Sequence, residues 1–237
     1  MILDKVRAIF TITQMAITIT FLIILMYLLG KKNKLIRQKW AALQMKLLGI
    51  DLQVEGEEDP NAKMQVMNHQ SVLDIILFEY LHSKDLAWIA KVEIAKIPWF
   101  GRIITAPNMV LVERESKKSL IKLLKDCKDR LKDNRPIAIF PEGTRTNGKK
   151  LLKFKAGAKM IAEKYDLLVQ PVIIIGTREI LDSQNLKQNS GVVKVIYMPS
   201  VKAEKKTSWY KDMEESMKLT LQNNLEKNDN KELRNDI

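Results

Sequence analysis

A histidine and an aspartate five residues apart, His69 and Asp74, are suited to proton-transfer chemistry. They belong to the stretch 68–74, which reads NHQSVLD. An imidazole is mostly neutral at pH 7 and can accept a proton, and a carboxylate within hydrogen-bond reach holds it in one tautomer. The pair is therefore a candidate general base with its orienting partner.

The same residues also have a structural interpretation. Ser71 followed three positions later by Asp74 is typical of a helix capping box, and His69 would then be an ordinary loop histidine. Taken alone, the stretch is compatible with both interpretations.

The elements around this stretch predict where its side chains lie. Residues 64–67 alternate weakly and predict a short strand, and residues 72–81 predict a helix. His69 is thus expected on the turn from a strand to a helix. In open α/β sheets, sites gather at such turns.

Short apolar runs alternate with helical patterns from residue 51 onward. Strands are predicted at 52–54, 64–67, 86–90, 109–112, 137–140, 169–175 and 192–198, and helices at 72–81, 116–131, 154–165 and 209–225. This alternation predicts an α/β domain over residues 51–237 with a largely parallel sheet, mixed at one edge. The last residues, 226–237, are charged and are expected to fray.

The N-terminal residues 1–50 predict a membrane-associated helical anchor. Residues 8–30 carry no charge and are long enough to cross a hydrocarbon core. Residues 35–50 then predict a basic amphipathic helix with Trp40 at the lipid interface and Arg37 off its apolar face. The alternative for this second helix is packing on the globular body. We expect the two helices to form one hairpin, either spanning the bilayer or lying in one leaflet.

The charge distribution supports this assignment. Basic residues follow the apolar stretch closely, so the positive-inside bias places the rest of the chain in the cytoplasm, at the inner membrane. A net charge of +12 indicates an anionic partner. A nucleic-acid partner is disfavoured, because no recognition helix or strand pattern of interleaved aromatic and basic residues occurs. With two histidines and the single cysteine Cys127, expected in a helix core, the sequence predicts no metal site.

Three further stretches place charged or turn residues at strand ends. Glu113 and Arg114 follow one predicted strand, and residues 140–145, reading FPEGTR, follow another. In residues 169–172, Pro171 interrupts an apolar run and is expected at an edge or bulge.

Together these stretches resemble the glycerolipid acyltransferases, the family of 1-acyl-sn-glycerol-3-phosphate acyltransferases. His69 and Asp74 match its first motif, and residues 140–145 match its third in full. Arg114 resembles the end of the second motif. The stretch that precedes this motif in the family is resembled by Lys91, Glu93, Pro98 and Gly101, and the fourth motif is resembled by residues 169–172. The resemblance covers residues 64–176. It implies about seven strands flanked by helices, with an N-terminal membrane-associated pair of helices.

The resemblance implies transfer of a fatty acyl group from an acyl thioester to the sn-2 hydroxyl of lysophosphatidic acid, giving phosphatidic acid. His69 would be the base and Asp74 its orienter, with acyl-CoA or acyl-carrier protein as donor and no cofactor. Arginine binds phosphate through a bidentate fork, so Arg114 and Arg145 are the expected phosphate ligands. Glu142 would accept a hydrogen bond from a glycerol hydroxyl or tie down the following turn. The expected substrate-binding residues are Lys91, Arg114, Glu142, Gly143, Thr144 and Arg145.

Two alternatives stay open at this point. In the first alternative, the chain is an acyltransferase whose acceptor is another lysophospholipid or another acylated polar lipid, because the motifs do not distinguish these acceptors from lysophosphatidic acid. A non-catalytic, membrane-bound protein that binds an anionic ligand would keep the fold but would not need His69 and Asp74 together.

Overall fold

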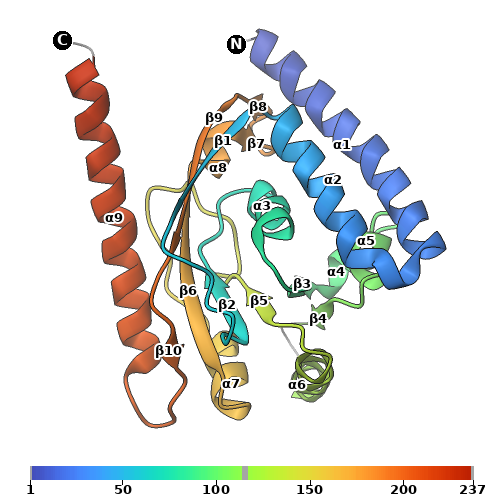
Figure 1. The fold of residues 1–237 in the computed structure, drawn as a ribbon, viewed down its shortest axis with the longest axis vertical. Helices are drawn as coiled ribbons and strands as arrows, with labels where there is room; N and C mark the ends of the chain where they lie inside the picture. Colours follow the sequence, from blue (N-terminus) through green and yellow to red (C-terminus); the bar gives the residue numbers. More distant parts are fainter. Residues whose placement is uncertain (1, 114–116, 236–237) are drawn as a thin grey trace.

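The computed structural model describes residues 2–113 and 117–235. The strands of its central sheet are β1 (Ile50–Glu55), β2 (Met64–Met67), β3 (Ala87–Lys91), β4 (Val110–Val112), β5 (Ile137–Ile139), β6 (Leu168–Ile175), β9 (Gly191–Tyr197) and β10 (Val201–Lys202). Their order across the sheet is β1-β9-β6-β2-β5-β3-β4, and β10 pairs with β6 off this path (Figure 1). The predicted α/β class and the approximate strand number are confirmed.

The sheet is mixed, with its parallel part in the middle and at the β4 edge. The pairs β6–β2, β2–β5, β5–β3 and β3–β4 are parallel, whereas β9 and β10 run antiparallel to β6. The carboxyl ends of β6, β2, β5, β3 and β4 consequently meet at one edge of the sheet. In open α/β sheets, ligands bind outside this edge.

Pro171 lies in the central strand β6, so of its two expected positions, an edge or a bulge, the edge is wrong. Its carbonyl accepts the N–H of Met198 at 3.0 Å. The N–H and C=O of one strand residue point toward the same neighbouring strand. The N–H that proline lacks would therefore point to the same side of β6 as the Pro171 carbonyl. There, β10 pairs with residues 168–169 and β9 with residues 172–175. The proline therefore occupies the break between two partner strands, where little pairing is lost.

Helices cover both faces of the sheet (Figure 1). One face carries α6 (Lys117–Lys132), α7 (Ala156–Lys164) and α9 (Trp209–Asn235), and the other α1 (Ile2–Leu28), α2 (Asn33–Leu47) and α3 (Leu73–Leu81). Helix α9 continues past the predicted end at residue 225, consistent with the good helix formers in its tail. The remaining short elements are η1 (Gly30–Lys32), α4 (Val92–Ala95), α5 (Arg102–Thr105), α8 (Thr177–Ile180), β7 (Leu181–Asp182) and β8 (Lys187–Gln188).

Each face of the sheet has its own apolar core. On the α9 face, Met213, Met217 and Leu221 recur every four residues and pack with the buried Cys127 of α6. On the other face, α3 buries Phe78 against residues of α2 and the sheet. The predicted core position of Cys127 is confirmed.

One side of the second helix of the N-terminal hairpin packs on the globular body, whereas Leu43 and Leu47 of its predicted lipid-facing side are exposed. The contact of that side with lipid stays a prediction. Arg37 is only 3% exposed and forms ion pairs with Glu79 and Asp85. The indole N–H of Trp40 donates to Thr18 Oγ1 of α1 at 3.0 Å, inside the hairpin. A buried arginine needs carboxylate partners, and here the helix turns it toward two of them.

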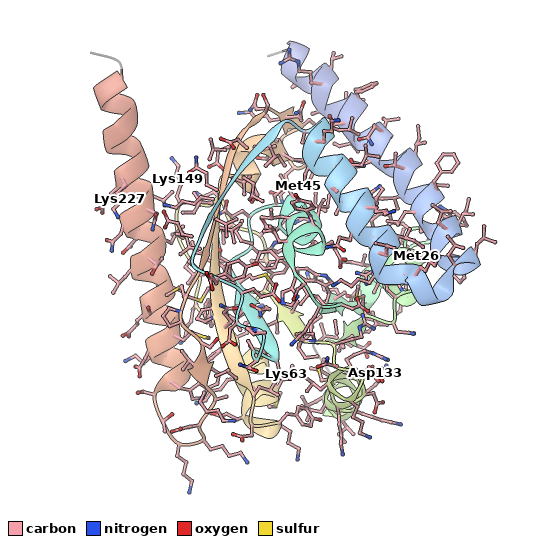
Figure 2. The ribbon with its side chains drawn as sticks, in the orientation of Figure 1. Met26, Met45, Lys63, Asp133, Lys149 and Lys227 are labelled. Atoms are coloured by element: carbon pink, nitrogen blue, oxygen red, sulfur yellow. The ribbon has the colours of Figure 1, made fainter. Side chains whose placement is uncertain are left out.

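Helix α1 is apolar on the side that faces away from α2. Side chains project from this outer side (Figure 2), and the large apolar residues Phe10, Phe21 and Leu28 of the helix are exposed. The segment Lys5–Leu28 contains an 18-residue window with a mean hydropathy of 2.2 and is long enough to cross a membrane. This N-terminal apolar helix indicates association with a membrane.

Candidate active site

The turn between β2 and α3 brings His69 and Asp74 together. Their side chains are joined by a hydrogen bond of 2.8 Å between Nδ1 of the imidazole and Oδ2 of the carboxylate. His69 is partly exposed and Asp74 is fully buried. Because Nδ1 is engaged, Nε2 is the ring nitrogen that remains to accept a proton.

The Asp74 carboxylate receives four hydrogen-bond donors. Besides His69, the backbone N–H groups of Gln70 and Ser71 donate to Oδ2 at 2.7 and 2.9 Å, and the hydroxyl of Thr177 donates to Oδ1. A buried carboxylate is costly unless it is well hydrogen-bonded. These donors stabilise its negative charge and fix its orientation toward the imidazole.

The capping box predicted for this stretch is only partly formed. Asp74 accepts the N–H of Ser71, as a capping residue does, and also orients His69. The N-cap itself is Val72 rather than the predicted Ser71. The Ser71 hydroxyl instead accepts the N–H of Leu73 at 3.2 Å and donates to the carbonyl of Leu181 at 2.6 Å.

Two aromatic rings support the His69 imidazole. The ring of Phe140, just after β5, stacks on it with centroids 3.9 Å apart and planes at 10°. Trp88 of β3 stacks on Phe140 in turn at 5.5 Å, and its indole N–H donates to Glu79 at 2.8 Å. The stack limits rotation of the imidazole out of the plane that Asp74 sets.

Glu142 connects the loop after β5 to the histidine. Its Oε1 accepts the N–H of His69 at 2.9 Å and its Oε2 accepts the N–H of Leu152 at 2.7 Å. Burial raises the pKa of Glu142 to about 7, against the lowering effect of these two donors. Both carboxylate oxygens of Glu142 thus accept backbone N–H groups. This fits the expected role of tying down the loop better than the alternative of binding a glycerol hydroxyl.

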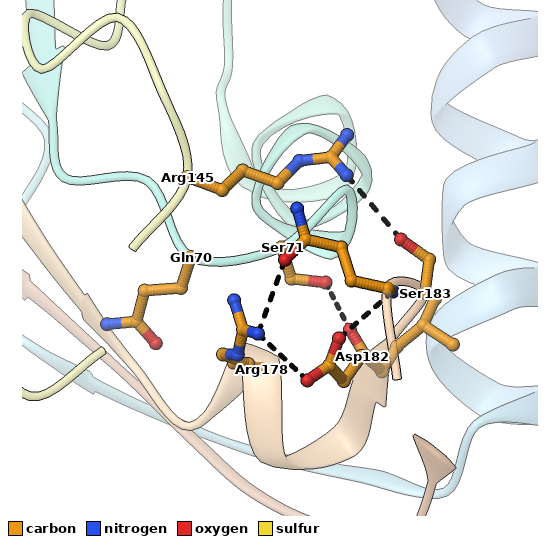
Figure 3. A pocket seen from close by; sticks show the side chains of 8 residues that line it. Gln70, Ser71, Arg145, Arg178, Asp182 and Ser183 are labelled. Carbon is orange, nitrogen blue, oxygen red and sulfur yellow. Dashed lines mark hydrogen bonds and ion pairs between the residues drawn. The ribbon is translucent and has the colours of Figure 1, made fainter. Parts of the chain in front are cut away.

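Two guanidinium groups line a small pocket next to Ser71 that is too narrow in this structure to hold a water molecule. The pocket is lined by Gln70, Ser71, Arg145, Arg178, Leu181, Asp182, Ser183 and Gln184 (Figure 3). Arg178 is ion-paired with Asp182 at 3.0 Å and donates to the carbonyl of Thr146 at 2.8 Å. Arg145 donates to the hydroxyl of Ser183 at 3.5 Å, and within the described residues no carboxylate forms an ion pair with it. Arg145 is therefore the less neutralised cation of the two.

The other predicted site residues are less closely grouped. Gly143 and Thr144 lie in the turn after β5, with Gly143 at a φ of 70° and Thr144 exposed. Lys91 is exposed at the carboxyl end of β3, which β5 separates from β2. Arg114 lies outside the described residues.

Thr177 and Arg178 are site residues that the sequence interpretation missed. Gly176 separates them from the end of β6, whose carboxyl end lies beside that of β2 because the two strands are parallel. Their position after the strand that contains residues 169–172 could have indicated that they belong to the site, because polar side chains at the carboxyl ends of parallel strands gather at one edge of the sheet. Among the described residues, no group of three or more His, Cys, Asp or Glu side chains is placed to hold a metal ion.

Comparisons with known proteins match the greater part of the chain. A family profile described as Acyltransferase matches residues 51–175. A 1-acyl-sn-glycerol-3-phosphate acyltransferase of Helicobacter pylori is 38% identical over 218 residues, covering 90% of this chain and 92% of the relative. The protein of the same name from Cocos nucifera is 30% identical over 214 residues, covering 85% and 70%.

A solved structure is similar over nearly the whole chain. The crystal structure of the 1-acyl-sn-glycerophosphate acyltransferase PlsC from Thermotoga maritima has a TM-score of 0.72 at 25% identity and covers 95% of each chain. The similarity therefore includes the N-terminal hairpin as well as the region that holds His69 and Asp74.

Proposed function

This chain belongs to the acyltransferase family, and on that premise we propose that His69 is the general base of its reaction. The chain acylates 1-acyl-sn-glycerol-3-phosphate, lysophosphatidic acid, to phosphatidic acid, a step of phospholipid biosynthesis. The observation that carries the assignment of the base is the 2.8 Å bond between Asp74 and Nδ1, which leaves Nε2 for the substrate.

The first step joins acceptor and donor. Nε2 of His69 takes the proton of the sn-2 hydroxyl while that oxygen attacks the thioester carbonyl carbon. A tetrahedral intermediate forms and the imidazole becomes an imidazolium. The Asp74 carboxylate stabilises this positive charge, and a positioned base of this kind contributes about 10²- to 10⁴-fold in rate.

The second step releases the products. The intermediate collapses, the carbon–sulfur bond breaks, and the imidazolium returns its proton to the departing thiolate. The ester of phosphatidic acid and a free thiol result, and His69 is neutral again. This direct attack requires no acylated residue of the protein.

Arg145 is proposed to bind the phosphate of the acceptor. Its guanidinium lies at the narrow pocket beside Ser71, whose side chains would have to move apart to admit a phosphate group, and a planar fork suits that group. Arg178 is proposed to hold the pocket wall rather than the phosphate, because Asp182 neutralises it. The role expected for Arg114 stays a prediction, and so does the weaker one for Lys91. A separate contribution of Gly143 and Thr144 to substrate binding also stays a prediction.

The donor and the location complete the proposal. We infer an acyl-CoA or acyl-carrier protein donor, since both are thioesters and either balances the reaction. Residues 1–50 are proposed as the membrane anchor and residues 51–237 as the catalytic domain. The basic residues after α1 support an inner membrane location with that domain in the cytoplasm.

One experiment tests the substrate assignment. Purified full-length protein in detergent is offered a panel of lysolipids with each donor, and the products are identified by mass. Phosphatidic acid should form from lysophosphatidic acid with at least one donor. Preferential acylation of a lysolipid without a terminal phosphate would contradict the assignment and the proposed role of Arg145.

A further inference from the structure

The segment from Lys91 to Gly101 carries a motif that the catalytic site leaves unexplained. It leads from the carboxyl end of β3 through α4 to α5 and includes Glu93, Pro98 and Gly101 of the resembling pattern. Its turn is tightly packed, because a Cβ on Gly101 would lie 2.1 Å from the carbonyl oxygen of Ala95. The glycine therefore allows a close turn that a larger residue would open.

This turn exposes three large apolar side chains next to each other in the chain. Ile97 is 47% exposed, Trp99 43% and Phe100 39%. Exposed apolar groups of this size are unusual when clustered on one short turn of a monomer.

The turn is attached to helix α1. The indole N–H of Trp99 donates to Thr20 Oγ1 of α1 at 3.1 Å. The guanidinium of Arg102 lies 5.6 Å from the ring of Tyr27 in α1 and 5.6 Å from that of Trp99. Ile103 packs against the core that α1 and α2 share. Figure 1 shows α5 beside the carboxyl-terminal part of α1. The apolar turn is thus continuous with the apolar outer side of α1.

The other end of the segment reaches the catalytic edge of the sheet. Lys91 ends β3, and Trp88 of the same strand stacks on Phe140, which stacks on His69. The segment contains Lys91 and Lys96 against Glu93 alone, and Arg102 directly follows it, so the charge here complements anionic lipid.

We propose that the turn 97–100 inserts into the lipid surface beside α1 and extends the membrane-facing surface to the catalytic edge. An acceptor lipid would then keep its acyl chain in the bilayer while its glycerol phosphate reaches His69. The inference rests on the proposed function, because a membrane lipid is the substrate that such a surface delivers. Trp and Phe on a short loop with flanking cations are suited to the interfacial region of a bilayer.

Site-specific depth measurements test the insertion without relying on activity. Cys127 is the chain's single cysteine and is buried, so an added surface cysteine can be labelled selectively. Phe100→Cys and the matched control Ile121→Cys carry an environment-sensitive fluorophore. Ile121 is 71% exposed on α6, on the opposite face of the sheet. The full chain is reconstituted into phosphatidylglycerol and phosphatidylcholine vesicles that contain phospholipid with a nitroxide on its acyl chain.

The probe at residue 100 should be quenched several-fold more strongly than the probe at residue 121. Equal, weak quenching at both positions would overturn the proposal. Shielding of residue 100 that grows with protein concentration in lipid-free detergent would also overturn it, in favour of a second copy as the partner. Because neither readout needs turnover, a failed acylation assay leaves this test intact.

A paired substitution adds a functional readout. Ile97→Asp with Phe100→Asp should reduce activity on vesicle-borne lysophosphatidic acid by about tenfold or more, since inserting charge into lipid is costly. Activity on a short-chain, monomeric acceptor should stay unchanged, and Ile121→Asp should affect neither. Equal loss on both acceptors would contradict lipid insertion and indicate a role inside the site.

Discussion

Replacing Thr177 by valine tests how the buried carboxylate is held. Thr177 is fully buried, and its hydroxyl donates to Oδ1 of Asp74, the oxygen that His69 does not use. Valine keeps the shape of threonine but places a methyl group against that oxygen. The variant Thr177→Val should therefore fold and should leave Asp74 with three donors in place of four.

The expected size follows from the charge on Asp74. A hydrogen bond to a charged group is worth about 1.5–3 kcal/mol, and each 1.36 kcal/mol in a barrier is about tenfold in rate. If most of this energy holds the carboxylate against the imidazolium, kcat should fall by about 10- to 100-fold. The KM for lysophosphatidic acid should change little, because Thr177 does not line the pocket that contains Arg145.

Steady-state kinetics on the reconstituted full chain measures both constants, and circular dichroism checks the fold. Thr177→Ser is the matched control, because it restores the hydroxyl and should recover most of kcat. A folded valine variant with wild-type kcat would refute the reasoning. Equal losses in the valine and serine variants would show that packing, not the hydrogen bond, matters at this position.

Three further changes test other parts of the account. Arg145→Ala should raise the KM for lysophosphatidic acid by about 10- to 100-fold and Arg145→Lys should rescue it in part, so an unchanged KM would place the phosphate elsewhere. Burial raises the pKa of Glu142 to about 7, so the folded chain keeps a proton that the unfolded chain releases above about pH 4.5. The free energy of unfolding should therefore fall as pH rises from about 5 to about 7, and Glu142→Gln should flatten this slope in denaturant titrations; an identical slope would argue against the raised pKa. Arg37→Ala leaves Glu79 and Asp85 without this partner and should destabilise the fold by about 3–5 kcal/mol, seen as a lower Tm in detergent; an unchanged Tm would show that the pairs contribute little.

The sequence was sufficient to place the main strands because buried parallel strands are short apolar runs bounded by polar turns. It also placed His69 and Glu142 at one edge, since parallel strands end on the same side of a sheet. The contact of Glu142 with the backbone of His69 was not predictable, because it joins residues 73 positions apart through the pairing of β2 and β5.

The orientation of α2 shows the limit most clearly. A helical pattern gives which residues share a face, but not whether that face meets lipid or protein. The sequence placed Arg37 only off the apolar face, yet the residue is buried, and its partner Glu79 is supplied by a helix 42 residues away. The hydrogen bond from Thr177 to Asp74 was missed for the same reason, since it spans 103 residues.

The central claim is that His69 takes the proton of the acceptor hydroxyl. Its most direct test is the single-turnover rate of phosphatidic acid formation by His69→Ala in vesicles, with acyl donor and lysophosphatidic acid both saturating. The account predicts a rate about 10²- to 10⁴-fold below that of the wild type, with lysophosphatidic acid still bound with near-normal affinity. A folded His69→Ala variant that forms phosphatidic acid at a near-normal rate would contradict the account and leave Asp74 with only its capping role.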